Sequence, residues 1–270
     1  MPNWLFGLVT VVTFYAFGIT GLAATRKWAP SLHHATLSHN DIVGYYFSAI
    51  TVLYGITLGL LMVGVWSTFS QTAEKVDREA DSLAALYMDV SQYPDPGRRV
   101  LQGDLRTYTR QVIDLAWPQQ QNGIIPKADE AVIAEIANDL ATFEPASEAQ
   151  KVLHAECYKQ FNELVQRRRS RVLSVTAGLS GALWSLLLVG AVITIAVTWC
   201  FHLHNEKMHL LMTALTSSLL GLMIFLVAAM DHPFLGKISV SPEPFKVVYD
   251  QLMGPEVRPP HRNPLPSQTP

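Results

Sequence analysis

Four long segments of the chain contain no charged side chain, and they dominate its hydrophobic pattern. They are residues 1–25, 42–73, 172–205 and 208–230. A helix needs about 20 mainly apolar residues to cross about 30 Å of hydrocarbon, and every segment is longer than that. The pattern therefore predicts an integral membrane protein with four transmembrane helices, the third beginning directly at Val172.

The segment between the second and third of these runs has a different pattern. Residues 74–171 carry 13 basic and 16 acidic side chains, and their apolar residues recur every three or four positions, which is typical of amphipathic helices. No stretch alternates as a half-buried strand does. We expect an all-α fold in which a helical cytoplasmic domain is inserted between transmembrane helices 2 and 3.

The same patterns divide the chain into five parts. Residues 1–73 hold transmembrane helices 1 and 2, and residues 172–230 hold helices 3 and 4. Between them, residues 74–171 form the helical domain. Residues 231–253 are a cytoplasmic tail that packs on this domain. Residues 254–270 hold six of the 16 prolines and are expected to be a disordered tail.

The distribution of Lys and Arg near the span ends predicts the orientation. Nine lie on the side of the domain and both termini, against three on the side of the short loops. We expect a multi-pass protein of the cell inner membrane, with the domain and both termini cytoplasmic. The first span alone argues the opposite, because its nearby basic residues, Arg26 and Lys27, follow it.

Composition narrows the function classes further. The chain is 16 % charged, has a net charge of −2 and contains two cysteines, which fits neither a disulfide-rich module nor a nucleic-acid-binding protein. No phosphate-binding loop, nucleophile elbow or zinc-protease motif occurs. We therefore expect no enzyme and no cofactor.

The lack of ionisable residues within the spans bears on transport. Coupled carriers usually place such residues at mid-membrane. A passive pore with an apolar constriction fits better, and so does a non-conducting protein that only anchors its domain to the lipid bilayer.

The second span contains a Gly55-x-x-x-Gly59 pattern, which favours close helix packing. At 100° per residue, Val52, Ile56 and Leu60 form an apolar stripe roughly 80° from these glycines. The stripe faces an axis shared between copies in one interpretation, and lipid or the core of its own subunit in the other.

Two clusters of polar residues lie close to the spans. His33, His34, His202 and His204 belong to the two short loops, where they would give a pH or metal response, although histidine also simply tolerates this interface; which metal, if any, is unknown. The basic cluster at residues 167–171 is interpreted as a topology signal that contacts anionic lipid headgroups, or alternatively as a group that attracts permeant anions to an inner vestibule.

Several stretches resemble a bestrophin-like membrane-protein family of bacteria and plants. They are Leu58-Gly59-Leu60 with the helix that follows, Trp117-Pro118, the basic entry to the third span, and Asp231-His232-Pro233-Phe234 with the Ser-Pro-Glu-Pro-Phe sequence at residues 241–245. Of the motif after the fourth span, Asp231, Pro233 and Phe234 are the residues that match.

The family is distantly similar to the bestrophin ion channels, and this resemblance implies an oligomeric channel, suspected to be a pentamer, that passes ions. It implies a neck of second-span residues at Val52, Ile56 and Leu60. The acidic run that binds calcium in animal bestrophins is not visible after residues 231–234, so calcium gating is not expected. The alternative is a non-conducting scaffold or signalling protein whose cytoplasmic helices bind a partner.

Overall fold

The computed structural model describes residues 3–28, 37–127, 129–236 and 238–254, and these residues form helices and connecting turns without any strand. The expectation of an all-α chain is confirmed for this part. Its contacts divide it into two units. The predicted tail at 254–270 lies outside the described residues apart from Gly254.

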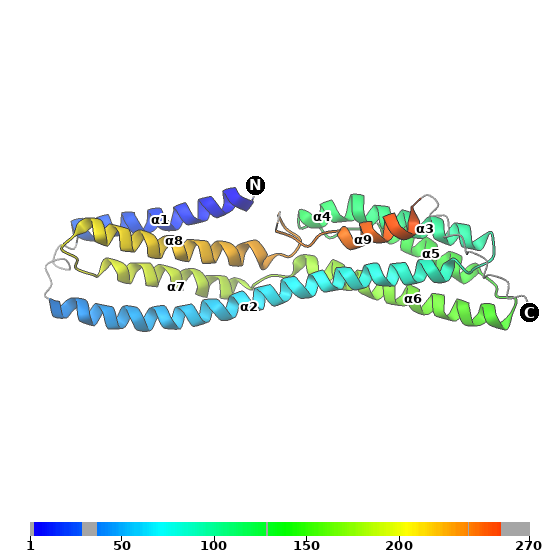
Figure 1. Ribbon diagram of the computed structural model, residues 1–270, viewed down its shortest axis with the longest axis horizontal. Helices are drawn as coiled ribbons and strands as arrows, with labels where there is room; N and C mark the ends of the chain where they lie inside the picture. Colours follow the sequence, from blue (N-terminus) through cyan, green and yellow to red (C-terminus); the bar gives the residue numbers. More distant parts are fainter. Residues whose placement is uncertain (1–2, 29–36, 128, 237, 255–270) are drawn as a thin grey trace, which may run out of the picture. The chain divides into compact units, whose positions relative to one another are not determined.

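The first unit comprises residues 1–73, 120–125 and 173–240, and helices make up most of it (Figure 1). Its helices are α1 (Asn3–Trp28), the first part of α2 (Leu37–Val90), α7 (Gly181–Trp199) and α8 (Glu206–Asp231). All four of these helices are long and apolar enough to cross a membrane, as the charge-free segments predicted.

Small residues allow α1 to lie alongside α8 in this unit (Figure 1). A Cβ atom added at Gly18 would collide with the hydroxyl of Ser217, so only glycine permits this approach. Hydroxyl groups on α1 bond within their own helix, since Thr10 donates to the Phe6 carbonyl at 2.9 Å and Thr13 to the Val9 carbonyl at 2.7 Å. Such bonds satisfy polar groups that lipid cannot.

The third apolar helix is shorter than the pattern predicts. Helix α6 (Glu148–Leu173) continues through Val172, and a 3₁₀ turn at Ser174–Thr176 separates it from α7. Ser180 caps the start of α7 by accepting a hydrogen bond from the Leu183 N–H at 3.4 Å. The predicted start at Val172 is therefore wrong, because the uncharged segment includes a turn as well as a helix.

The second unit comprises residues 74–119, 126–172 and 241–270. Its elements are the last part of α2, α3 (Gly97–Gln111), a π-helical turn at Val112–Ala116, α4 (Trp117–Gln121) as far as residue 119, α5 (Glu130–Thr142), α6 as far as Val172, α9 (Glu243–Val248) and a π-helical turn at Tyr249–Met253. Leu83, Leu105 and Leu140 are fully buried in its core.

Local signals explain two features of this unit. The start of α6 is stabilised by Ser147, whose hydroxyl accepts from the Gln150 N–H at 3.2 Å, while the Gln150 side chain accepts from the Ala146 N–H at 2.7 Å, an arrangement close to a capping box. Helix α9 contacts α4 through Phe245, whose ring meets that of Trp117 edge-on at 6.1 Å.

Candidate functional site

The first part of α2 presents the predicted neck residues on an open face. Val52, Ile56 and Leu60 are 59 %, 58 % and 70 % exposed. No other described element of the chain covers this stripe. The side chains are therefore available to lipid or to another copy of the chain, which leaves their role in a pore a prediction.

The opposite face of α2 is held against α7 and α8. Tyr54, Leu58 and Val65 belong to the buried core of the first unit, together with apolar residues of those two helices. The Tyr54 hydroxyl donates to the Leu187 carbonyl at 2.9 Å. This contact fixes the rotation of α2, so the stripe has a defined direction.

Gly55 and Gly59 have open surroundings. A Cβ atom added at either position would meet no atom within 4 Å among the described residues. The close helix packing predicted for this pair therefore does not occur with another described helix of the same chain. Packing against a second copy remains a prediction.

The motif after the fourth span ties the end of α8 to the start of α7. The Asp231 carboxylate accepts from the Leu179 N–H at 2.6 Å and from the Trp184 indole N–H at 3.0 Å. The His232 Nδ1 lies 3.0 Å from the Ala177 carbonyl, and a Cβ added at Gly178 would come within 2.7 Å of that imidazole. The Pro233 carbonyl accepts a hydrogen bond from the Val240 N–H at 2.8 Å, and Phe234 is buried. Residues 231–234 with these contacts form the Asp231 clasp.

The clasp provides hydrogen bonds that a helix start and a turn need, so its chemistry is structural. It holds residues 177–179, which precede the third apolar helix, α7, and are not part of it.

The predicted histidine group is only partly described. His33 and His34 lie outside the described residues. The His202 N–H donates to the Asn40 side chain at 2.8 Å, and His204 is exposed. Within the described ranges, no three His, Cys, Asp or Glu side chains are placed to hold a metal ion, so a metal or pH response at these four positions stays a prediction.

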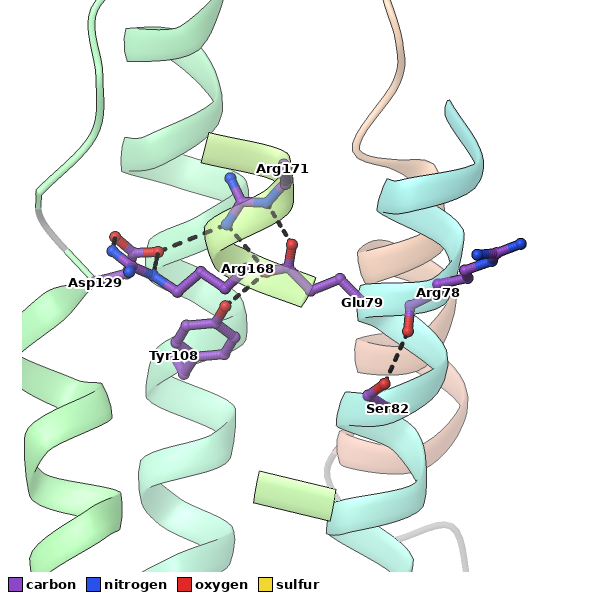
Figure 2. A network of polar contacts seen from close by, with 7 residues as sticks. All are labelled: Arg78, Glu79, Ser82, Tyr108, Asp129, Arg168 and Arg171. Carbon is purple, nitrogen blue, oxygen red and sulfur yellow. Dashed lines mark hydrogen bonds and ion pairs between the residues drawn. The ribbon is translucent and has the colours of Figure 1, made fainter. Parts of the chain in front are cut away.

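Sequence reasoning missed a buried network of charges in the second unit. Figure 2 shows Arg171 between Glu79 and Asp129, and the Arg168 side chain reaching Asp129 as well. Arg171 donates to both Glu79 oxygens, at 2.7 and 3.0 Å, and its guanidinium lies 3.6 Å from Asp129. The side chains of Glu79, Asp129 and Arg171 are fully buried.

The partners of this network satisfy most of its polar groups. Arg168 donates to both Asp129 oxygens at 2.7 Å, and the Tyr108 hydroxyl donates to Glu79 at 2.7 Å. The rings of Trp117 and Phe245 each lie 5.8 Å from the Arg171 guanidinium carbon. Two carboxylates and two guanidinium groups balance in charge, as burial requires.

The pKa values follow from burial and pairing. Burial raises the pKa of Tyr108, and the negative charge of Glu79 raises it further. Burial alone would raise the pKa of Asp129, but the hydrogen bonds and charge of Arg168 outweigh it and hold that pKa below its usual value. The Asp129 carboxylate therefore stays ionised at neutral pH.

This network corrects the interpretation of the basic cluster at residues 167–171. Arg171 is fully buried and the Arg168 side chain is only 13 % exposed. Both are engaged with carboxylates inside the second unit and are not available to lipid headgroups. The missed signal is Glu79, which interrupts the apolar stripe of Val76, Ala80 and Leu83.

Comparisons with solved structures support the fold. Two variants of a bacterial bestrophin homologue from Klebsiella pneumoniae are similar to this chain. The first has a TM-score of 0.65 and 10 % identity over 90 % of this chain and 98 % of that one, and the second 0.67 and 11 % over 92 % and 99 %. A crystal structure described as a membrane protein matches with a TM-score of 0.67 and 12 % identity over 93 % and 98 %. Identities this low show likeness of fold alone.

Sequence comparison identifies the family. No curated protein matches this sequence. The family described as Bestrophin-like domain matches residues 12–245, which include the stripe on α2, the buried charge network and the Asp231 clasp. This match confirms the resemblance expected from the motifs, and the chain belongs to the Bestrophin-like domain family.

Proposed function

We propose that the chain forms a bestrophin-like oligomeric ion channel in which the first part of α2 lines the pore. Val52, Ile56 and Leu60 from several copies form an apolar neck, and five copies are expected from the family resemblance. The observation that carries this proposal is the exposed stripe. Its three residues are each more than half exposed, while the opposite face of α2 is fixed against α7.

The chemistry of such a neck is passive. An apolar constriction opposes ions because it dewets, and small changes in its width change conduction. Selectivity then depends on pore size and on backbone dipoles. The proposal gives no residue a catalytic role and needs no cofactor, in keeping with membership of a bestrophin-like family.

The proposed setting is the cell inner membrane. The four apolar helices cross it, and the second unit and both termini lie in the cytoplasm. The excess of Lys and Arg on the side of the second unit supports this orientation.

A substitution in the neck tests the proposal. Purified protein is reconstituted in planar bilayers and its currents are recorded for the wild type, Ile56→Ala and Ile193→Ala. Ile193 is a matched control because it is an exposed isoleucine on α7. We expect Ile56→Ala to widen the neck and raise conductance, and Ile193→Ala to leave it unchanged. If neither the wild type nor Ile56→Ala passes current over a range of pH and ions, the channel proposal is wrong.

The alternative function is a non-conducting scaffold or signalling protein, and one feature of the second unit favours it. A groove of about 330 Å³ lies between the turn after α2 and the end of α5, and its lining residues include Phe143, Asp95, Asp139 and Glu144. This combination suits a basic peptide with apolar side chains. Absence of current together with saturable binding of such a peptide supports the scaffold.

A further inference from the structure

Helix α7 has a notch at Gly190 that receives a side chain of α2. A Cβ atom added at Gly190 would lie 2.4 Å from two ring carbons of Tyr54. Carbon atoms in van der Waals contact are about 3.5–4.0 Å apart, so the ring occupies the space that any larger residue at position 190 would fill. Glycine therefore lets α2 approach α7 more closely than another residue would.

The Tyr54 ring is fixed in this notch. Tyr54 is 9 % exposed, and its hydroxyl donates to the carbonyl of Leu187, three residues earlier in α7, at 2.9 Å. The ring cannot swing out of the notch without breaking this bond, and a buried hydroxyl without a partner is costly. A larger residue at position 190 is therefore expected to displace the helix that carries the ring.

Helix α7 cannot move away from α2 freely, because α8 packs behind it. Leu187 and Ala191 flank Gly190 and are buried in the core cluster of the first unit, which also contains residues of α8. The open face of α2 meets no such resistance, since Ile56 is 58 % exposed. A change of volume at the Tyr54–Gly190 contact therefore moves α2 rather than α7.

The direction of this movement follows from helical geometry. At 100° per residue, Tyr54 lies about 160° around the helix from both Val52 and Ile56. The Tyr54 ring and the apolar stripe are thus on nearly opposite sides of α2. Pushing α2 away from α7 carries the stripe in the direction in which it points, which in the proposed channel is towards the pore axis.

We propose that Tyr54 and Gly190 are positioning residues for the neck, because their contact sets the distance between α2 and α7 and thereby the width of the pore at Ile56. This inference rests on the proposed channel function, since the stripe has a width only if it lines a pore. Side-chain volume at the contact then changes conduction in both directions, although neither Tyr54 nor Gly190 faces the pore.

Single-channel recording of the purified full chain in planar bilayers tests this assignment. Gly190→Ala adds one methyl group, which displaces α2 by about 1 Å. It should lower the conductance about twofold or more, because conduction through an apolar neck changes with small changes in its width. Gly181→Ala is the matched control on α7, since a Cβ atom at Gly181 meets no atom within 4 Å among the described residues. It should conduct like the wild type.

The opposite change is made on α2. Tyr54→Leu shortens the side chain in the notch, lets α2 lie closer to α7 and should raise the conductance about twofold. In the double variant Gly190→Ala/Tyr54→Leu, the shorter side chain makes room for the added methyl group, so the conductance should return towards the wild-type value. A contact with only a structural role would lower the stability of the variants but leave the conductance of intact assemblies unchanged.

Ile56→Ala, recorded alongside, separates this inference from the proposed function. If Ile56→Ala changes the conductance while Gly190→Ala and Tyr54→Leu conduct like the wild type, the channel stands and the positioning role is wrong. If no chain passes current, Ile56→Ala included, the proposed function fails and this inference fails with it.

The sign of the two effects and their combination give further ways to overturn the positioning role. It is wrong if Gly190→Ala and Tyr54→Leu change the conductance in the same direction, or if the double variant is no closer to the wild type than either single variant. Should Gly190→Ala fail to assemble, Tyr54→Leu carries the test alone, and a wild-type conductance in that variant would contradict the proposal.

Discussion

The two parts of helix α2 carry similar apolar side chains but differ in how far these side chains are buried. Before residue 74, Leu60 and Val63 are 70 % and 66 % exposed, whereas Val76 and Leu83, after it, are fully buried. The first part contains no charge beyond Asp41, yet the second part buries Glu79 against Arg171.

The difference shows where each part of the helix finds the contacts that cover its apolar side chains. The second part finds its partners within the chain, so its pattern is explained by one copy alone. The first part keeps one face open, and an open apolar face needs lipid or further copies.

The largest effect is expected for the buried charge in the second part of α2. Glu79→Ala leaves Arg171 buried with a weaker counter-charge, so the free energy of unfolding should fall by about 3–5 kcal/mol. Thermal or denaturant unfolding of the purified chain measures it. Glu74→Ala is the control, because Glu74 pairs with Arg78 at the surface and should lose less than about 1 kcal/mol. Equal losses would contradict a special role for the network.

Two leucines of the same helix give the most direct comparison. Leu83→Ala creates a cavity in the core of the second unit and should lower the free energy of unfolding by about 2–5 kcal/mol. Leu60→Ala removes an exposed side chain and should change it by less than about 0.5 kcal/mol. Its effect should appear instead in the assembly, as a shift towards smaller particles in gel filtration. If both variants destabilise the chain equally, Leu60 is buried within a single copy and the contrast fails.

A smaller effect is expected where the motif after α8 holds the start of α7. The two Asp231 oxygens accept from the Leu179 N–H and the Trp184 indole N–H. Asp231→Asn keeps one oxygen acceptor but loses the other and the negative charge, so the free energy of unfolding should fall by about 1–3 kcal/mol. Tryptophan fluorescence reports the unfolding. Trp184→Phe removes one donor only and should cost less than Asp231→Asn. The reverse order would argue against the clasp.

The smallest effect concerns pH. Burial raises the pKa of Asp104 to about 6, and the hydrogen bond and charge of Asp139 and the charge of Glu135 act in the same direction. Because the folded state then binds a proton more tightly than the unfolded state, stability should fall as pH rises from about 4 to about 6. Screening at this partly exposed site limits the change to about 1 kcal/mol.

Asp104→Asn should remove that fall, and unfolding midpoints measured between pH 4 and pH 8 would show it. Asp114→Asn, at an exposed position, serves as the control. A pH profile that is the same in Asp104→Asn and the wild type would rule out this assignment.

The sequence predicted the parts of the fold that depend on local pattern. Charge-free runs located the four apolar helices, and the three-to-four-residue spacing of apolar positions identified residues 74–171 as helical. The sequence could not predict contacts between distant residues. Glu79 and Arg171 are 92 positions apart, and the Asp231–Leu179 bond that accompanies the late start of α7 joins residues 52 apart.

In the candidate site, too, the local pattern was predictable from the sequence and the contacts were not. Helical geometry placed Val52, Ile56 and Leu60 on one stripe, and the structure shows that stripe exposed. What covers the stripe is not encoded in a single copy, because a contact between copies leaves no periodicity that differs from contact with lipid. For the same reason, Gly55 and Gly59 predicted close packing without identifying the partner.

The mass of the purified particle tests the central claim most directly, namely that the open face of α2 is covered by other copies. Light scattering of the protein in mild detergent, corrected for bound detergent, gives the protein mass. We predict a closed assembly whose mass is a multiple of the 29.9 kDa chain, with five copies expected from the family resemblance. A single particle of one chain, stable and unchanged over a range of protein concentrations, would contradict the account.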